Sequence, residues 1–391
     1  MDKILYITPY LPFPNNKAAN LFISKRIELL SSKYTIDLLS VTNGKYNNNI
    51  QDFRIKNYIK NFHFIQRKPV GIKSIISAFI QKESLFNLLS VDIINKISEL
   101  LKSNTYSYVI IEHSYLSSYI IQKIPSISAK AITVFHNIEQ DYFYDLYKKT
   151  KFKNPKKVFY YLEYIANKQL ENKLYETSTK SFWFLSNHDL INVQNKTNNK
   201  NLLLSPTINF TLKNHSKSEK KYDLLYMGQL DNERNLHGLK WFINNVWELL
   251  DDTINFAIVG RGDTNTIQSI INQRNNITLI GEVNNLDQIF SQAKLTIIPI
   301  FNTIGVQTKL FDSLSQGNIT ICSEDAVNGT IFQDEQHLLI AKDKNDFANK
   351  IHKVLNNINS YSFLYSNLQQ LTKNFESSEL IKEMEGSLNA H

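Results

Sequence analysis

The sequence predicts an α/β protein with two doubly wound domains in tandem, each a parallel sheet covered by helices on both faces. Three observations support this prediction. Apolar strand patterns alternate with helical patterns in both halves of the chain. The alternation stops at a polar stretch, 211–222, and then begins again. A chain of 391 residues is also longer than one hydrophobic core usually serves.

The first half opens with a βαβ unit. "KILYIT" at 3–8 is an apolar strand pattern, and 18–32 has helical spacing, with apolar residues on one side and Lys25, Arg26 and Glu28 on the other. "YTIDLLSV" at 34–41 is the next strand, and this succession implies parallel pairing. Two more strand patterns, "YSYVIIEHS" at 106–114 and "AKAITVFHN" at 129–137, each end in polar residues. Folds of this class gather their chemistry at the carboxyl ends of their strands.

The second half repeats the alternation. The expected strands are 223–228, 255–262, 277–283, 294–301 and 319–324, and the expected helices are 235–250, 264–274, 285–293 and 308–317. The patterns divide the chain into a domain at 1–210, a linker at 211–222, a domain at 223–372 and a helical segment at 373–391. We expect two such domains, joined by a hinge, to face each other across a cleft, and ligands commonly bind in such clefts.

Composition narrows the class of protein. The single cysteine, Cys322, excludes an intramolecular disulfide and a cysteine metal cluster, which suits a reducing cytoplasm. The opening "MDKILYITPY" has the pattern of a strand, so we expect no signal peptide, and no run approaches the ~18 apolar residues of a spanning helix. Residues 1–215 carry 29 Lys and Arg against 15 Asp and Glu, so the first half is expected to face an anionic partner.

One basic segment favours a membrane surface as that partner. Six lysines lie within 148–157, among the aromatic residues of 141–169. Lysines among aromatic rings suit the headgroup region of an anionic membrane, and 68–82 is a second basic amphipathic stretch. A solvated charge run is the plainer alternative. Single-stranded nucleic acid is a further one, but no nucleic-acid module accompanies the run, and the acidic second half argues against a continuous track. We therefore predict no nucleic-acid partner.

Lys309 and Asp312 stand at the start of the helix that follows the fourth strand of the second domain. Backbone N–H groups at a helix start attract phosphate, and a lysine there adds a positive charge. A carboxylate one turn later could accept hydrogen bonds from a ribose diol. The pair therefore indicates a nucleotide-diphosphate site, although a surface ion pair with i,i+3 spacing is an alternative interpretation. The loop "VGRGD" at 259–263 lacks the third glycine of a dinucleotide fingerprint.

Histidines and carboxylates follow two strands of the first domain. Glu112 and His113 end one strand, and "FHNIEQDY" at 135–142 ends another with His136 and Glu139. Such groups can bind sugar hydroxyls or move protons. The sequence contains no H-E-x-x-H, P-loop or G-x-S-x-G motif, so we expect neither a dedicated metal site nor one of those chemistries.

Taken in order, "YDLLYMGQLDNERNLHGLKWFINNVWELL", "FAIVGRGD", "ITLIGEV", "LDQIFSQAKLTIIPI" and "GVQTKLFDSLSQGNITICSED" resemble the donor domain of GT-B glycosyltransferases, specifically the large retaining family four. "KILYITPYLPFPNNKAAN" and "VFHNIEQDY" are similar to that family's N-terminal loop and His-Asn-x-Glu segment. The resemblance implies an acceptor-binding first domain, a donor-binding second domain, a C-terminal helix that crosses back, and no cofactor or metal.

The resemblance also assigns site residues. Lys309 matches the lysine that binds the diphosphate, Asp312 stands where the family has a ribose-binding glutamate, and His136 matches a histidine near the donor sugar. Lys309 and His136 are thus the expected catalytic residues. The remaining donor-binding candidates are Gln229, Asn235, Arg261, Glu282, Val283, Gly305, Val306, Gln307 and Thr308, and the acceptor-side candidates are Asn16, Lys17, His113, Asn137 and Glu139.

The resemblance implies a glycosyltransferase that moves a sugar from a nucleotide-sugar donor to a lipid-linked oligosaccharide in surface polysaccharide synthesis. It would work in the cytoplasm, on the inner face of the membrane, and retain the anomeric configuration. A nucleotide-sugar 2-epimerase can share the fold. A non-catalytic partner protein is a further alternative, because Ile304, Gln229 and Gln307 occupy positions where the family often has an acid, a basic residue and an arginine.

Overall fold

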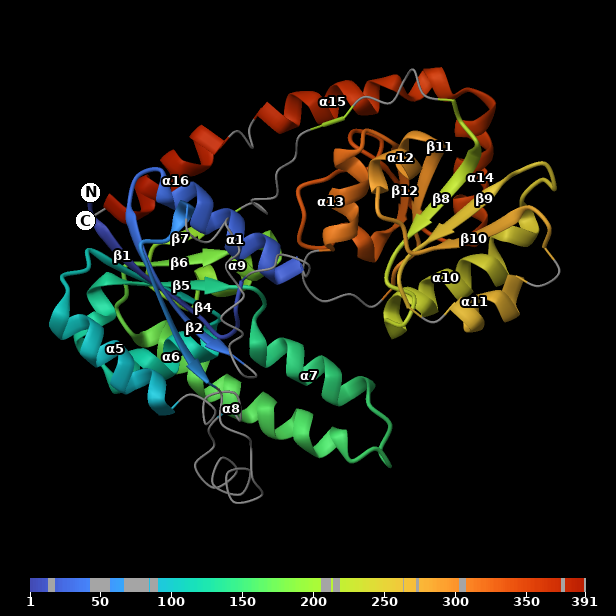
Figure 1. Ribbon diagram of the computed structural model, residues 1–391. Coiled ribbons are helices and arrows are strands. Elements are labelled where there is room, and N and C mark those ends of the chain that lie inside the picture. The colour runs from blue at the N-terminus through green and yellow to red at the C-terminus, as the bar shows by residue number, and fades with distance from the viewer. Residues whose placement is uncertain are drawn as a thin grey trace. The chain divides into compact units, whose positions relative to one another are not determined.

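The computed structural model describes residues 1–12, 18–42, 57–66, 84, 91–204, 212–213, 219–262, 264–271, 274–301, 307–373 and 377–389. The chain divides into two compact units (Figure 1). The first unit is Met1–Ile208 together with Ser377–His391, and the second unit is Asn209–Glu376. The basic stretch 68–82 lies outside the described residues.

The first unit is built on a seven-stranded parallel sheet. Its strand order is β3-β2-β1-β4-β5-β6-β7, so the winding direction reverses between β1 and β4. The strands are β1 (Lys3–Thr8), β2 (Thr35–Thr42), β3 (Asn61–Gln66), β4 (Tyr108–Glu112), β5 (Ala131–Phe135), β6 (Ser181–Phe184) and β7 (Asn201–Leu203). The helices are α1 (Ala18–Ser31), α5 (Val91–Ser103), α6 (Ser114–Lys123), α7 (Glu139–Lys149), α8 (Lys156–Glu176), α9 (Asn187–Gln194) and α16 (Ser377–Asn389). Ligands of open parallel sheets bind at such a reversal point, outside the carboxyl ends of the strands.

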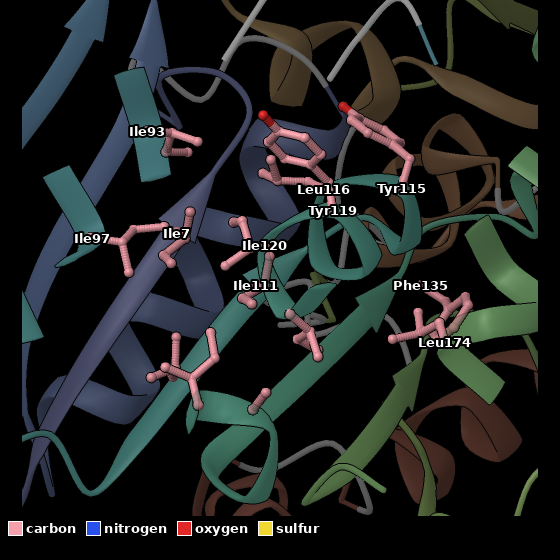
Figure 2. Close-up of a cluster of buried hydrophobic side chains, with 14 of the residues drawn as sticks. Ile7, Ile93, Ile97, Ile111, Tyr115, Leu116, Tyr119, Ile120, Phe135 and Leu174 are labelled. Atoms are coloured by element: carbon pink, nitrogen blue, oxygen red, sulfur yellow. The ribbon is translucent and has the colours of Figure 1, made fainter. Parts of the chain in front are cut away.

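The core of the first unit explains why these strands read as continuous apolar runs. All five residues of β5 are buried, as expected for a parallel sheet covered on both faces. Figure 2 shows Ile7, Ile111 and Phe135 from three strands packed with side chains of α5 and α6. Neighbouring residues point to the opposite face, so Tyr6 and Glu112 lie beneath α1 instead, where they contact Arg26.

The last helix, α16, packs on the first unit. Trp183 of β6 donates a hydrogen bond from Nε1 to Ser387 Oγ at 2.9 Å, and Ser387 in turn donates to Ser181 Oγ at 2.8 Å. Met384 and Leu388, on the same helix, are fully buried. These contacts return the end of the chain to the unit in which it began.

The second unit has a six-stranded parallel sheet of order β10-β9-β8-β11-β12-β13, which reverses between β8 and β11. Its strands are β8 (Tyr222–Met227), β9 (Phe256–Val259), β10 (Ile277–Gly281), β11 (Ala293–Ile298), β12 (Ile319–Ser323) and β13 (Leu339–Ala341). Its helices are α10 (Glu233–Asn245), α11 (Thr264–Ile271), α12 (Leu286–Ser291), α13 (Thr308–Ser315), α14 (Lys344–Asn356) and α15 (Ser362–Lys373). The helix expected at 235–250 ends as α10 at Asn245 and is followed by a short 3-10 turn, Trp247–Leu249.

Candidate functional site

Lys309 lies at the start of α13, beyond the carboxyl end of β11. Its ammonium group donates a hydrogen bond to Asn235 Oδ1 at 2.9 Å and lies 5.3 Å from the centre of the Tyr226 ring. We call Lys309, Asn235 and Tyr226 the Lys309 site. It joins the end of β8, the start of α10 and the start of α13, at the point where the sheet reverses.

The electrostatics of the Lys309 site are unusual for a surface helix. Burial lowers the pKa of Lys309 to about 7, and burial raises the pKa of Asp312 to about 6. Within the described part of the chain, Lys309 makes no ion pair with Asp312 or with any other carboxylate. The interpretation of these two residues as a surface ion pair is therefore wrong. Lys309 is a partly buried cation, and the neighbours that the structure describes around its ammonium group, Asn235 and Tyr226, are neutral.

A short hydrogen-bond network fixes Asn235. The side-chain amide of Asn235 donates to the backbone carbonyl of Gln229 at 3.0 Å, and the backbone carbonyl of Asn235 accepts from the Tyr226 hydroxyl at 3.0 Å. Asn232 caps α10 by accepting hydrogen bonds from the N–H groups of Arg234 and Asn235. The Asn235 carboxamide oxygen is thus held toward Lys309 by contacts to both β8 and its own helix.

Glycine allows the strand-end loops of the second unit to approach closely. A Cβ atom at Gly260 would lie 1.7 Å from the Gly228 carbonyl oxygen, and one at Gly238 would lie 1.8 Å from the Pro299 carbonyl oxygen. The Gly228 N–H donates to the Val259 carbonyl at 3.1 Å. Any side chain at Gly260 or Gly238 would therefore separate backbones that surround the Lys309 site.

The other donor-side candidates have mixed positions. Gln229, Arg261 and Glu282 are exposed at the ends of β8, β9 and β10, and Val283 is half-buried against a small apolar cluster. Gln307 is the N-cap of α13 and makes no side-chain cap hydrogen bond. Thr308 begins α13, but its side chain is not described, and 302–306, which includes Ile304, Gly305 and Val306, lies outside the described residues.

Polar side chains also gather at the reversal point of the first unit. The histidine cluster consists of Glu112, the last residue of β4, and of Tyr10, His113, His136 and Glu139, which lie in the segments after β1, β4 and β5. The pairing runs between strands. His136 Nε2 lies 2.6 Å from Glu112 Oε2, and His113 Nδ1 lies 3.1 Å from Glu139 Oε1. The structure thus brings Glu112, His113, His136 and Glu139 together in one cluster, whereas the sequence indicated them only as two separate pairs, each at the end of its own strand.

Glu112 is held by a buried arginine that the sequence analysis placed on the polar side of its helix. Arg26 is fully buried, and its guanidinium contacts the Glu112 carboxylate and donates to the Tyr6 hydroxyl at 3.1 Å. That placement of Arg26 was wrong, because its charge is paired beneath α1 instead of solvated. Burial alone would raise the pKa of Glu112, but Arg26 and the hydrogen bond from His136 outweigh burial and lower it to about 2.

His136 and His113 differ in their surroundings. Burial, together with the neighbouring His113, lowers the pKa of His136 to about 4, although Glu112 opposes this shift. His113 has a φ of 70°, an uncommon backbone angle for a residue other than glycine, and its Nε2 lies 3.1 Å from the Tyr10 hydroxyl. Such strained residues concentrate at functional sites, so the cluster is a candidate for ligand contact.

Glu171 is a further buried carboxylate that the sequence analysis missed. It lies on α8 and accepts hydrogen bonds from Ser114 Oγ at 2.7 Å and from the N–H groups of Glu139 and Gln140. Burial raises its pKa to about 8, although these hydrogen bonds act in the opposite direction. Because Glu171 satisfies the first amides of α7, it holds Glu139 beside His113. Only its apolar helical neighbours in the sequence could have indicated that it faces inward.

The remaining acceptor-side candidates are less informative. Asn137 is half-buried between His136 and α7, and Asn16 and Lys17 lie outside the described residues.

Among the residues that the structure describes, no group of three or more His, Cys, Asp or Glu side chains is arranged to hold a metal ion. No described helix is long and apolar enough to cross a membrane.

Helices α7 and α8 form an antiparallel hairpin at the edge of the first unit (Figure 1). Phe152 in its connecting turn is 92% exposed, and Val158 is 64% exposed. Five of the six lysines in 148–157 are exposed. The sixth, Lys157, is half-buried, and its ammonium group donates hydrogen bonds to the backbone carbonyls of Tyr147 and Thr150. The hairpin tip therefore presents apolar and cationic groups together.

Comparisons with known proteins agree with this architecture. Residues 221–357 match the family described as Glycosyl transferases group 1. A Klebsiella pneumoniae protein described as an uncharacterized 44.6 kDa protein in the cps region is 26% identical over 392 residues, which cover 94% of this chain and 96% of that protein.

Two solved structures share the fold over nearly their whole length. The crystal structure of TarM has a TM-score of 0.68 at 10% identity, and the match covers 100% of this chain and 99% of the TarM chain. Another matching TarM structure is from S. aureus. Anabaena Alr3699/HepE in complex with UDP has a TM-score of 0.67 at 10% identity, with 99% of both chains covered.

The two parallel doubly wound units in tandem define the class: the fold is that of GT-B glycosyltransferases. The matched segment 221–357 covers β8 to α14 and includes Lys309 and Asn235. This domain therefore matches the Glycosyl transferases group 1 family, and the fold over the whole chain is the one found in GT-B glycosyltransferases.

Proposed function

We propose that the protein transfers a sugar from a nucleotide-diphosphate sugar to a lipid-linked oligosaccharide, with retention of configuration and without a metal ion. The single observation that carries the donor assignment is the state of Lys309. Among the described residues, the contacts of the partly buried Lys309 ammonium group are an amide oxygen and an aromatic face, so its charge costs free energy in the empty protein. A diphosphate would supply the missing negative charge.

The chemistry of the transfer follows from this placement. As the bond between the sugar carbon and the diphosphate oxygen breaks, negative charge grows on the diphosphate. Lys309 and the first N–H groups of α13 would stabilise that charge in a partly dry site, and Asp312 would accept hydrogen bonds from the ribose. The acceptor hydroxyl would attack from the same face, and its proton would pass to a phosphate oxygen of the leaving group.

Three observations support the choice of donor and acceptor. Alr3699/HepE, which shares the fold, is solved in complex with UDP. A TarM structure holds UDP together with α-GlcNAc-glycerol and fondaparinux. The K. pneumoniae relative is described as a protein of a cps region, which favours a role in surface polysaccharide synthesis. We further propose that the hairpin of α7 and α8 places the enzyme on the anionic inner face of the membrane, where a lipid-linked acceptor resides.

The donor assignment is tested by thermal unfolding with a panel of UDP-, GDP- and CMP-sugars. A matching donor should stabilise the protein by ~2.7 kcal/mol at a hundredfold excess over Kd. The variant Lys309→Met should lose most of this stabilisation. Lys294→Met is the matched control, because Lys294 pairs with Asp223 at the opposite end of β11. If both variants respond to the donor as the unsubstituted protein does, the donor site is not at Lys309.

Turnover separates the competing functions. With lipid-linked oligosaccharides extracted from bacterial membranes, a glycosyltransferase releases nucleoside diphosphate and lengthens the acceptor. A 2-epimerase would convert the donor without any acceptor. A non-catalytic partner protein would bind none of the nucleotides. Either of the last two results would overturn the proposal.

A further inference from the structure

The buried ion pair between Arg26 and Glu112 is an expensive feature of the first unit. Both side chains are fully buried, and among the residues that the structure describes Arg26 Nε and Nη2 have no hydrogen-bond partner. Unpaired buried donors cost free energy, and apolar groups of similar size often replace buried ion pairs with no loss of stability. The pair therefore calls for an explanation other than stability.

Glu112 divides its two oxygens between Arg26 and His136. Oε1 accepts from Arg26 and from the Tyr6 hydroxyl, while Oε2 lies 2.6 Å from His136 Nε2. An ionised carboxylate can only accept hydrogen bonds, so Nε2 of His136 must carry a hydrogen. In the neutral ring, Nδ1 is then an acceptor, and within the described part of the chain no hydrogen bond to it is found.

We propose that Arg26 is a positioning residue: by keeping Glu112 ionised, it fixes His136 in the neutral Nε2–H form and leaves Nδ1 free to accept a hydrogen bond from a carbohydrate hydroxyl. The role of Nδ1 rests on the proposed function, whereas the state of the ring does not. The groups that face His136 are Glu112, Arg26 beyond it, and His113, whose ring is stacked on that of His136.

Removal of the Arg26 charge should change the proton balance. Glu112 and His136 would then remain as an isolated carboxylate and imidazole 2.6 Å apart in a buried site. The imidazole would take up a proton to neutralise the carboxylate, because no other cation of the described residues is hydrogen-bonded to Glu112. A protonated His136 donates from both nitrogens and can no longer accept a hydrogen bond at Nδ1.

Nitrogen-15 NMR of the histidine rings tests the inference in the full chain, with His136→Gln to assign the signals. The unsubstituted protein should show the neutral Nε2–H tautomer of His136 at pH 7. Arg26→Met should raise the pKa of His136 by roughly three units, so that most rings are protonated at pH 6. Arg26→Lys should restore the original pattern, and Lys25→Met, which removes the neighbouring cation paired with Glu28, should leave it unchanged.

An Nδ1–H tautomer in the unsubstituted protein would overturn the inference, even if Arg26→Met failed to fold. So would an Arg26→Met spectrum that matches that of the unsubstituted protein. In turnover assays at pH 6, Arg26→Met should raise the KM for the carbohydrate substrate by about tenfold, the effect of one lost hydrogen bond. If the ring behaves as stated but no donor turns over, the positioning stands and the proposed function fails.

Discussion

The rings of His113 and His136 stack face to face, with 4.2 Å between their centres and 7° between their planes, although they follow different strands. His136 is paired with Glu112, which directly precedes His113, and His113 is paired with Glu139, which lies three residues after His136. Positive charges on two imidazoles this close would repel each other, so His113 lowers the pKa of His136 and helps to keep His136 neutral. The stack thus links the loops after β4 and β5 into one unit.

Stability should fall in acid because of this cluster. The folded-state pKa of His136 is about 4, below its usual value, so between pH 6.5 and 4 the unfolded chain binds more protons and protonation favours unfolding. Replacement by asparagine should reduce the loss of stability over that range, by on the order of 1–3 kcal/mol. Denaturant unfolding of both proteins at pH 7, 5.5 and 4.5 measures the difference. Equal pH profiles would contradict a neutral, buried His136.

Lys309→Met should stabilise the empty protein while it removes donor binding. Burial lowers the pKa of Lys309 to about 7, so the unfolded chain holds this proton more tightly than the folded chain does, and the resulting cost to stability is greatest at pH 7 and below. An apolar side chain of similar length removes this penalty, and we expect a gain of roughly 1–3 kcal/mol. Chemical denaturation at pH 6 is the measurement. A loss of stability would mean that the hydrogen bond to Asn235 outweighs the cost of burying the ammonium group.

The sequence predicts strands such as β1 and β11 better than it predicts the contacts at the sheet edge. Parallel strands are buried on both faces, so their apolar runs stand out, and Lys309 is recognisable beside a strand end. The pairs His113–Glu139 and His136–Glu112 cannot be recognised in the sequence. Consecutive residues of a strand point to opposite faces, so each side chain finds its partner on a neighbouring strand or loop.

The burial of Arg26 also could not be predicted from the sequence. Helical spacing assigns it to the polar face of α1, and only the position of Glu112 beneath that helix explains its burial. Periodicity describes faces of a helix, whereas a buried charge depends on a partner far along the chain. Short strands such as β7 and β13 also escape prediction, because three residues carry too little pattern.

The hairpin of α7 and α8 should carry the membrane affinity. The variant that replaces its exposed lysines by glutamine, and Phe152 by serine, should lose flotation with anionic liposomes. Each lysine contributes about 1 kcal/mol near such a surface, so partitioning should weaken by more than ~100-fold. The five lysines are Lys148, Lys149, Lys151, Lys153 and Lys156; Lys157 is kept for its backbone contacts.

The matched control neutralises five exposed lysines elsewhere in the first unit: Lys33, Lys102, Lys123, Lys173 and Lys196. It lowers the net charge by the same amount but leaves the hairpin intact. Flotation should persist in this control. If both variants lose flotation equally, the hairpin has no special role and only the total charge of the first unit matters.

Gly260→Ala should disturb the proposed donor site through the backbone. The added methyl group would meet the Gly228 carbonyl oxygen at 1.7 Å, so the loops after β8 and β9 would have to separate. We expect a loss of about 1–3 kcal/mol in stability and weaker donor binding. Gly386→Ala is the control: nothing lies within 4 Å of the added atom, and alanine within α16 should stabilise the protein by about 0.5–1 kcal/mol. Melting curves of the two variants should therefore shift in opposite directions.

Proton uptake on donor binding tests the central claim most directly. Lys309 has a pKa of about 7 in the empty protein, so at pH 8 most molecules carry a neutral amine there. A bound diphosphate favours the ammonium form, and a nucleotide-diphosphate sugar has no ionisation of its own near this pH. Calorimetric titration at pH 8, in two buffers with different heats of ionisation, should therefore show uptake of roughly 0.9 proton per donor bound. Lys309→Met would remove that uptake. Donor binding without proton uptake in the unsubstituted protein would contradict the account.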